Sequence, residues 1–181
     1  MRRTAIILYG PPASGKDTIT TELIRQDPCF VVHRRMKVGS GNTTGYRLGT
    51  LPELEAFREA GQVLYENARY GNIYAFITSQ LEQDLMSGIP VLHVGQLAGV
   101  RALKAYPIQW TAVALWCSRE TTRARAVQRG DSDIERRLVA WDETQADLAQ
   151  ARPNDFDMVL DNEKLSPDLA AGSMIRFMRD V

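Results

Sequence analysis

The chain has 181 residues, of which 44% are hydrophobic and 24% are charged, and this length and composition predict one globular domain with a sizeable core. Its 22 basic and 22 acidic residues cancel, so charge gives no support to a role on nucleic acids or membrane surfaces. No apolar run reaches membrane-spanning length, and Cys29 and Cys117 lie in apolar runs without metal-ligand spacing. We therefore expect a cytoplasmic protein with both thiols reduced and buried.

Apolar runs typical of buried strands alternate along the chain with amphipathic patterns typical of helices. The predicted strands are residues 4–9, 29–32, 91–94, 111–117 and 156–160. The predicted helices begin after residue 15 and then span residues 50–61, 78–86, 97–105, 118–128, 132–152 and 166 onward. Residues 33–50 are basic and glycine-rich, so we expect an irregular, substrate-facing excursion there, and residues 62–76 are predicted to form a hairpin. The alternation predicts an α/β fold with a five-stranded, parallel core sheet flanked by helices.

A glycine-rich loop stands between the first predicted strand and the first predicted helix. Its sequence, GPPASGK, places Gly10, Gly15 and Lys16 at the spacing of a phosphate-binding P-loop, whose N–H groups and lysine bind phosphates. The next residue usually supplies a hydroxyl ligand to Mg²⁺, but here it is Asp17. A carboxylate is a good Mg²⁺ ligand, so we expect Asp17 to hold the metal. The loop residues predicted to bind ATP are Gly10, Ala13, Ser14, Gly15, Lys16, Asp17 and Thr18.

The strands at residues 91–94 and 111–117 end without the acidic residue that hydrolysis-driven switch proteins use to hold Mg²⁺. A small-molecule kinase is therefore favoured over a switch or motor protein. Phosphoryl transfer depends mainly on positive charge around the transferred group, and arginine-rich segments supply that charge.

Five segments in order resemble motifs of the guanylate kinase family, within the P-loop nucleoside monophosphate kinases, over nearly the whole chain. They are GPPASGKDT, HRRMKVGSGNTTGYR, GQVLYENARYGNIYAF, RARAVQRGDSDIERRLVAW and FDMVLDNE. The resemblance implies an ATP- and Mg²⁺-dependent enzyme that transfers the γ-phosphoryl group to the phosphate of a small phosphorylated acceptor. It implies a core of residues 1–33, 77–128 and 152–181, a substrate-binding insert at about 34–76, and an arginine-rich lid at about 129–134 that leads into a helix to residue 151.

The resemblance also assigns roles to residues outside the loop. Those that fall on acceptor-phosphate ligands are Arg34, Lys37, Tyr46 and Tyr74, and His33 stands beside them. Arg125 and Asn162 fall on ATP-binding positions. The catalytic set implied is Lys16, Asp17, Arg129 and Arg137. We expect no nucleic-acid or membrane partner, and a monomer or a homodimer.

The positions that read guanine in the family differ in this chain. Val31 stands where the family has Ser, Tyr65 stands where it has Glu, and the stretch LHVGQLAG lacks the family's acids. Glu66 is one residue out of register, which on a strand means the opposite face. We therefore expect an acceptor other than GMP, contacted by Tyr65 and Gln96 among others.

Three alternatives stay open. Gly-Lys-Asp-Thr and His33-Arg34 are also similar to ribose 1,5-bisphosphate phosphokinases, which suggests a ribose-bisphosphate-like acceptor. A second alternative is a true guanylate kinase that acts on GMP and dGMP. A member of another class, a non-catalytic guanylate-kinase-like binding module, is disfavoured because the loop lysine and the lid arginines are intact.

Overall fold

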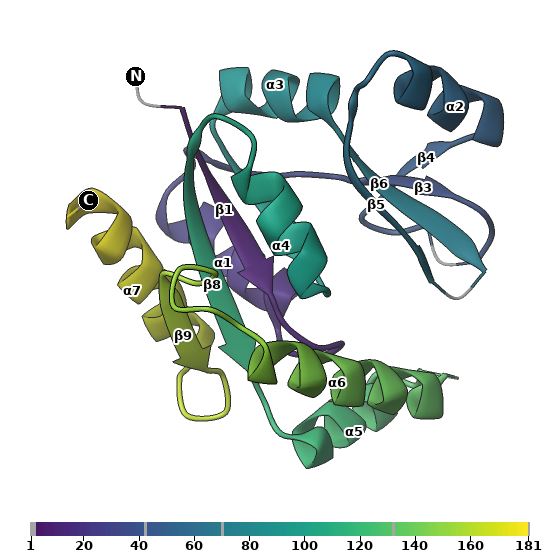
Figure 1. Ribbon diagram of the computed structural model, residues 1–181. Coiled ribbons are helices and arrows are strands. Elements are labelled where there is room, and N and C mark those ends of the chain that lie inside the picture. Colours follow the sequence, from purple (N-terminus) through teal and green to yellow (C-terminus); the bar gives the residue numbers. More distant parts are fainter. Residues whose placement is uncertain (1–2, 42, 70, 132, 181) are drawn as a thin grey trace.

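The computed structural model describes residues 3–41, 43–69, 71–131 and 133–180 and is shown in Figure 1. Its larger sheet has five parallel strands in the order β2-β7-β1-β8-β9. These are β1 (Thr4–Tyr9), β2 (Phe30–Val32), β7 (Ile89–Val94), β8 (Gln109–Trp116) and β9 (Met158–Asp161). Each overlaps a run predicted as a buried strand, so the predicted α/β class with a five-stranded parallel sheet is confirmed.

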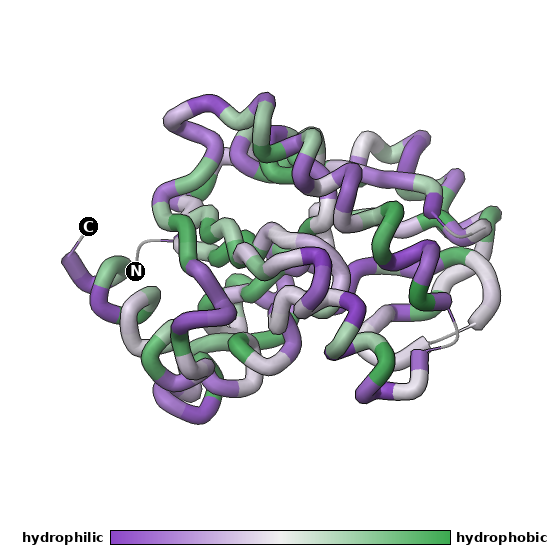
Figure 2. The backbone as a smooth tube through the Cα atoms, turned by 90° about the horizontal axis from the view of Figure 1, so that it is seen from below, coloured by the Kyte–Doolittle hydropathy of each residue, from purple (hydrophilic) through white to green (hydrophobic). Residues whose placement is uncertain are grey.

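Helices cover both faces of this sheet because the central strand is apolar on both sides. Ile6 and Leu8 pack against α1 and α7, whereas Ala5, Ile7 and Tyr9 pack against α3 and α4, and all five side chains are fully buried. The helices are α1 (Lys16–Gln26), α3 (Thr78–Ser87), α4 (Leu97–Lys104) and α7 (Pro167–Asp180). In Figure 2 the hydrophobic stretches accordingly concentrate in the interior of the fold.

A second sheet carries a separate small core. Its order is β4-β3-β6-β5, and helix α2 packs against one of its faces through Leu54, which meets Met36, Ala75 and Ile77. The elements are β3 (Met36–Val38), β4 (Arg47–Gly49), α2 (Leu51–Glu59), β5 (Val63–Arg69) and β6 (Asn72–Ile77). The predicted helix and hairpin are present, and Thr50 caps α2 by accepting a hydrogen bond from the Glu53 N–H. The expectation of irregular structure at 33–50 is wrong in part, because three-residue strands such as β3 and β4 are too short to leave an alternating pattern.

Two further helices, α5 (Arg119–Gln128) and α6 (Ile134–Ala149), pack on each other beyond the carboxyl ends of the core strands (Figure 1). Ser118 caps α5 by accepting from the Thr121 N–H. Ser132, the first residue of the helix predicted at 132–152, lies outside the described residues, and Asp133, which precedes α6, makes no side-chain capping bond. None of the helices in the described part of the chain is long and apolar enough to cross a membrane.

The two cysteines differ in environment. Cys117 is buried, and burial raises the pKa of its thiol. Cys29 is exposed, so the expectation that both thiols are buried is wrong for this residue. It lies in the turn before β2, where its N–H donates to Asp27.

A buried carboxylate connects α4 to the turn after α6. Asp155 accepts two hydrogen bonds from the Arg101 guanidinium, at 3.0 and 2.8 Å, and a third from the Arg152 N–H at 2.7 Å. The Arg101 guanidinium is the main cause that lowers the pKa of Asp155 to about 2. A lowered carboxylate pKa stabilises the folded state above its ordinary value of 3.8, and this stabilisation is lost as pH falls towards about 2.

We therefore expect Asp155→Asn to lower the free energy of unfolding at neutral pH by about 1–2 kcal/mol, a value reduced because Arg101 is partly exposed. The difference from the parent protein should shrink as pH falls from about 4 to about 2, as measured by urea unfolding at several pH values. Asp142→Asn, which breaks an exposed pair with Arg119, is the matched control and should cost less than about 1 kcal/mol. A difference for Asp155→Asn that stayed constant over this pH range would contradict the assignment.

Candidate active site

The loop between β1 and α1 has the backbone geometry that phosphate binding requires. Ala13 and Gly15 both have left-handed conformations, with φ of 60° and 93°, and Gly15 directly precedes α1. A side chain at Gly10 would bring its Cβ within 2.5 Å of the Leu115 carbonyl oxygen on β8. The loop therefore turns tightly at the carboxyl edge of the sheet and leads into a helix N-terminus, which favours anions.

Two residues far along the chain hold this loop in place. The Asn162 side-chain amide donates to the Ser14 carbonyl, and it lies so close to Gly15 that a Cβ there would be 2.3 Å from it. The Arg125 guanidinium donates to the carbonyl oxygens of Ala13 and Asn162, at 3.0 Å each. Both residues, which the sequence predicted to bind ATP, thus lie at the loop and fix its conformation through its carbonyl oxygens.

The Lys16 side chain is folded onto its own loop by hydrogen bonds. Its ammonium donates to the carbonyl oxygens of Gly10 and Pro11, at 2.8 Å each, and to the Ser14 hydroxyl at 3.2 Å. Burial lowers its pKa to about 8, since a desolvated ammonium is costly. Phosphate oxygens are stronger acceptors than carbonyl oxygens, so a bound triphosphate would draw this ammonium out of the loop.

Asp17 lies in the first turn of α1 with its side chain 92% exposed, and its Oδ1 is 3.5 Å from His93 Nδ1. His93 Nε2 is 2.7 Å from the Thr20 hydroxyl, so the imidazole bridges two positions of α1. Burial, followed by the Lys16 ammonium, lowers the pKa of His93 to about 4, and the ring is neutral at pH 7. Among the described residues, no three His, Cys, Asp or Glu side chains gather to hold a metal by themselves. A single open carboxylate beside a phosphate loop still fits Mg²⁺, which keeps several waters and takes phosphate ligands.

A cluster of aromatic and basic side chains lies on one face of the second sheet; we call it the clamp, and it consists of Arg35, Lys37, Tyr46 and Tyr74. The Arg35 guanidinium lies 4.6 Å from the Tyr74 ring centre and 5.4 Å from that of Tyr46. The Lys37 ammonium lies 5.7 Å from the Tyr46 ring and donates to the Ser40 carbonyl at 2.6 Å. Two cations and two phenols on one face are suited to a phosphate group.

Arg35, and not Arg34, occupies the clamp. Met36 points into the core beneath α2, so residues 35 and 37 must point to the other face of the strand. Arg34 has the same parity as Met36 and is exposed on the opposite side. Arg34, which the sequence predicted to bind the acceptor phosphate, therefore lies outside the clamp, whereas Lys37, Tyr46 and Tyr74, predicted to bind the same phosphate, lie together in it.

Tyr65 on β5 and Gln96 before α4 connect the insert to the core. The Tyr65 hydroxyl donates to Gln96 Oε1 at 2.7 Å, and the Tyr65 ring lies against Gly99, where a Cβ would be 2.7 Å away. Phe76 stands opposite Tyr65 in the β5–β6 register. Val31, on β2, is partly buried. Tyr65 and Gln96 therefore lie together as one hydrogen-bonded unit.

Two other acceptor-side residues point elsewhere. Glu66 faces the α2 side of its sheet and forms an ion pair with Arg58 at 2.7 Å. His33 is buried, and its Nδ1 is 2.7 Å from Asp84 Oδ2 on α3. The structure therefore does not place His33 in the clamp, contrary to the expectation that it contacts the acceptor.

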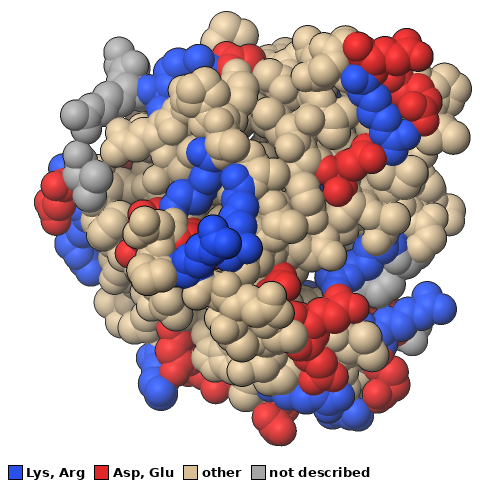
Figure 3. Space-filling view, viewed as in Figure 1, with Lys and Arg blue, Asp and Glu red and all other residues tan. Residues whose placement is uncertain are grey.

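The lid arginines are paired with acids of the same segment. Arg129 binds Asp131 at 2.9 Å, and Arg137 binds Asp131 and Asp133 at 3.2 and 2.9 Å. On the face shown in Figure 3, basic and acidic side chains are interspersed rather than gathered into a field of one sign. Both arginines would have to leave these partners in order to contact a transferring phosphoryl group.

Two residues of the site were not assigned from the sequence, Arg35 and His93. The signal for Arg35 was the position of Met36, an apolar residue between two basic ones, which predicts that Arg35 and Lys37 lie on the opposite face of a strand. The signal for His93 was its place in β7, directly beside Leu8 of β1, because ligands of parallel sheets bind at the carboxyl ends of such strands.

No family model matches the sequence. The chain is 27% identical over 174 residues to a guanylate kinase of Wolbachia sp. subsp. Brugia malayi (strain TRS), covering 87% of this chain and 84% of that protein. It is 26% identical over 174 residues to the guanylate kinase of Wolbachia pipientis wMel, covering 87% and 82%. Among solved structures, a guanylate kinase from Anaplasma phagocytophilum superposes with a TM-score of 0.67 at 16% identity, covering 98% of this chain and 85% of that one. The predicted P-loop kinase fold and the resemblance to guanylate kinases are confirmed.

Proposed function

We propose that this guanylate-kinase-like chain is a phosphotransferase that moves the γ-phosphoryl group of ATP to the phosphate of a nucleoside monophosphate. The proposal is supported by the electrostatic interaction between the clamp and the lysine of the P-loop. After burial, the Arg35 guanidinium is among the charges that lower the pKa of Lys16, so the clamp lies within electrostatic reach of the P-loop. Two phosphates held at neighbouring sites are what a transfer between them requires.

The chain's own residues then have distinct roles. The backbone N–H groups of Ala13, Gly15 and Lys16, at the end of the loop and the α1 N-terminus, bind the ATP phosphates, and the Lys16 ammonium stabilises the negative charge of the transferred group. Asp17 would hold Mg²⁺, which supplies positive charge between the phosphates when it is bound. Arg35 and Lys37 orient the acceptor phosphate, whose anionic oxygen forms the new P–O bond while the bond to ADP breaks. No general base is needed, because that oxygen carries no proton that must be removed.

GMP is the acceptor that the comparisons favour. The named relatives and the solved neighbour are guanylate kinases, so a GMP acceptor has more support than the expectation against it, which rested on Val31 and Tyr65. The Tyr65–Gln96 unit supplies a hydroxyl and an amide, which are groups that can hydrogen-bond a purine edge.

A second candidate is another phosphorylated acceptor, such as a ribose bisphosphate. Its support is that Phe76 stands opposite Tyr65 and that Glu66 turns to the other face, so these strand positions direct no carboxylate towards guanine N–H groups. An unpaired N–H group costs about 1–3 kcal/mol on burial.

A panel of acceptors tests the proposal through acceptor-dependent ADP release. The panel contains GMP, dGMP, AMP and ribose 1,5-bisphosphate, and we expect the highest kcat/KM with GMP. A preference for ribose 1,5-bisphosphate would replace the acceptor and leave the reaction type intact. Acceptor-independent turnover would indicate a simple NTPase, and no turnover with any acceptor would favour a binding module.

A further inference from the structure

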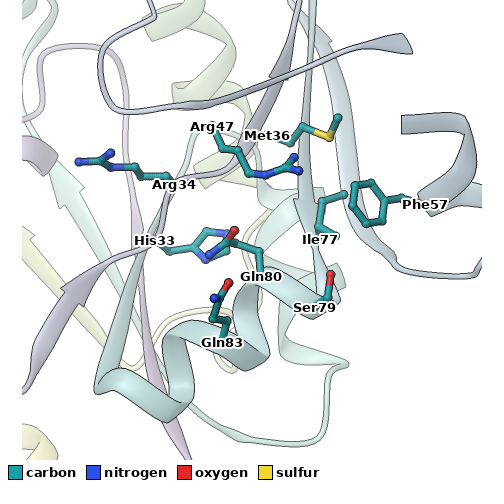
Figure 4. A pocket seen from close by; sticks show the side chains of 9 residues that line it. All are labelled: His33, Arg34, Met36, Arg47, Phe57, Ile77, Ser79, Gln80 and Gln83. Carbon is teal, nitrogen blue, oxygen red and sulfur yellow. The ribbon is translucent and has the colours of Figure 1, made fainter. Parts of the chain in front are cut away.

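A cavity lies on the face of the insert that carries Met36, opposite the face that carries the clamp (Figure 4). It has a volume of about 210 Å³ and lies between the strands of the second sheet and the start of α3. Its lining residues are His33, Arg34, Met36, Arg47, Phe57, Ile77, Ser79, Gln80 and Gln83. Met36, Phe57 and Ile77 form an apolar wall, and the other six residues are polar. In Figure 4 the Arg34 guanidinium points away from the other labelled side chains.

His33 brings an unused hydrogen-bonding atom to this cavity. Its side chain is 0% exposed and stacks on Phe76, with the ring centres 5.5 Å apart. Nδ1 donates to the Asp84 carboxylate, which accepts only, whereas Nε2 has no partner among the described residues. A buried polar atom without a partner is rare in folded proteins.

Arg47 presents a second atom of the same kind. Its Nη2 pairs with Glu53, and its guanidinium lies 5.8 Å from the Phe57 ring centre, but Nη1 is buried and has no partner among the residues described. Both of these buried atoms, His33 Nε2 and Arg47 Nη1, thus belong to side chains that line the same cavity.

The start of α3 adds backbone donors. The Thr78 N–H donates to the Gln62 carbonyl at 2.8 Å. The next two residues, Ser79 and Gln80, line the cavity, and N–H groups in the first turn of a helix have no intrahelical acceptor. The helix dipole at this end favours negative charge.

From these observations we infer that the cavity is a second oxyanion-binding site, separate from the clamp, that takes a small phosphate or carboxylate with a compact apolar body. Arg47 and the α3 N-terminus would meet the oxyanion, His33 Nε2 would form a hydrogen bond with the ligand, and the apolar wall would meet the body of the ligand. The volume of about 210 Å³ suits a metabolite of a few carbons. Because Met36 lies between Arg35 and Lys37, a ligand here would contact the reverse side of the strand that carries the clamp.

The test uses the two histidines of the chain, His33 and His93, as separate reporters. With ¹⁵N-labelled histidine, the imidazole resonances are followed by NMR during titration with inorganic phosphate in one arm and isobutyrate in the other. We expect a saturable shift of the His33 Nε2 resonance in at least one arm. The arm that responds distinguishes a phosphorylated ligand from an organic acid. A His33 resonance that stays unmoved in both arms, at concentrations where phosphate moves His93 beside the P-loop, would overturn the inference.

Variants show whether the shift of the His33 resonance arises from a ligand in this cavity. Gln83→Trp places a ring at the exposed mouth of the cavity and should abolish the His33 shift, whereas Met86→Trp, at an 83% exposed position of the same helix, should leave it unchanged. Arg47→Met should abolish the shift without filling the cavity. Arg35→Ala should preserve the shift, because the clamp lies on the other face. Loss of the His33 shift in Lys16→Met would show that it is relayed from the P-loop and would also refute the site.

Discussion

Asp17→Ala should lower kcat by about 10²–10³-fold, whereas Asp17→Ser should stay within about tenfold of the parent enzyme. Asp17 occupies the position at which P-loops hold Mg²⁺ through a hydroxyl. Its carboxylate is 92% exposed, and His93 lies 3.5 Å from it. Without a metal this carboxylate would repel the phosphates beside it, and Ala removes the ligand while Ser restores the usual one.

The measurement is ATP turnover with the acceptor as Mg²⁺ is varied, together with Mn²⁺ binding to the ATP complex by electron paramagnetic resonance. Asp17→Ala should weaken Mn²⁺ binding and raise the Mg²⁺ concentration at half-maximal rate, and Asp17→Ser should shift both far less. Near-normal Mg²⁺ dependence in Asp17→Ala would make Asp17 a helix-start acid that only complements the dipole of α1.

Arg35→Ala should lower kcat/KM for the phosphorylated acceptor by about 10²-fold, mostly through KM. The Arg35 guanidinium lies over both clamp tyrosines, so its loss removes a charge-assisted contact to the acceptor phosphate. ATP binding in the absence of acceptor should change far less, because the P-loop contacts remain.

Arg34→Ala is the matched control, since it removes the same side chain one position earlier. Arg34 is exposed on the opposite side of the strand, so kcat/KM should change by no more than about twofold. Steady-state kinetics with both substrates varied, and ATP titration calorimetry, distinguish the two variants. A larger loss in Arg34→Ala than in Arg35→Ala would restore the assignment made from the sequence motif.

The linear sequence determined those features that depend on neighbouring residues. The spacing of Gly10, Gly15 and Lys16 after an apolar run specified the loop, because a tight turn into a helix N-terminus is a local event. Five apolar runs alternating with amphipathic patterns specified the parallel sheet, and the amphipathic pattern from residue 50 specified the start of α2, which Thr50 caps. Each of these follows from backbone preferences and periodicity within about a dozen residues.

Tertiary structure alone decided which side chains share a face and what surrounds them. Arg34 and Arg35 are chemically identical neighbours, and only the burial of Met36 beneath α2 turned Arg35 towards the clamp and Arg34 away from it. His93 and Asp17 are brought together by the pairing of β7 with β1, and His33 meets Asp84 across a separation of 51 residues. Such contacts arise from the packing of distant segments, which local periodicity does not predict. They determine the arrangement of the clamp, the surroundings of Asp17 and the cavity beside His33.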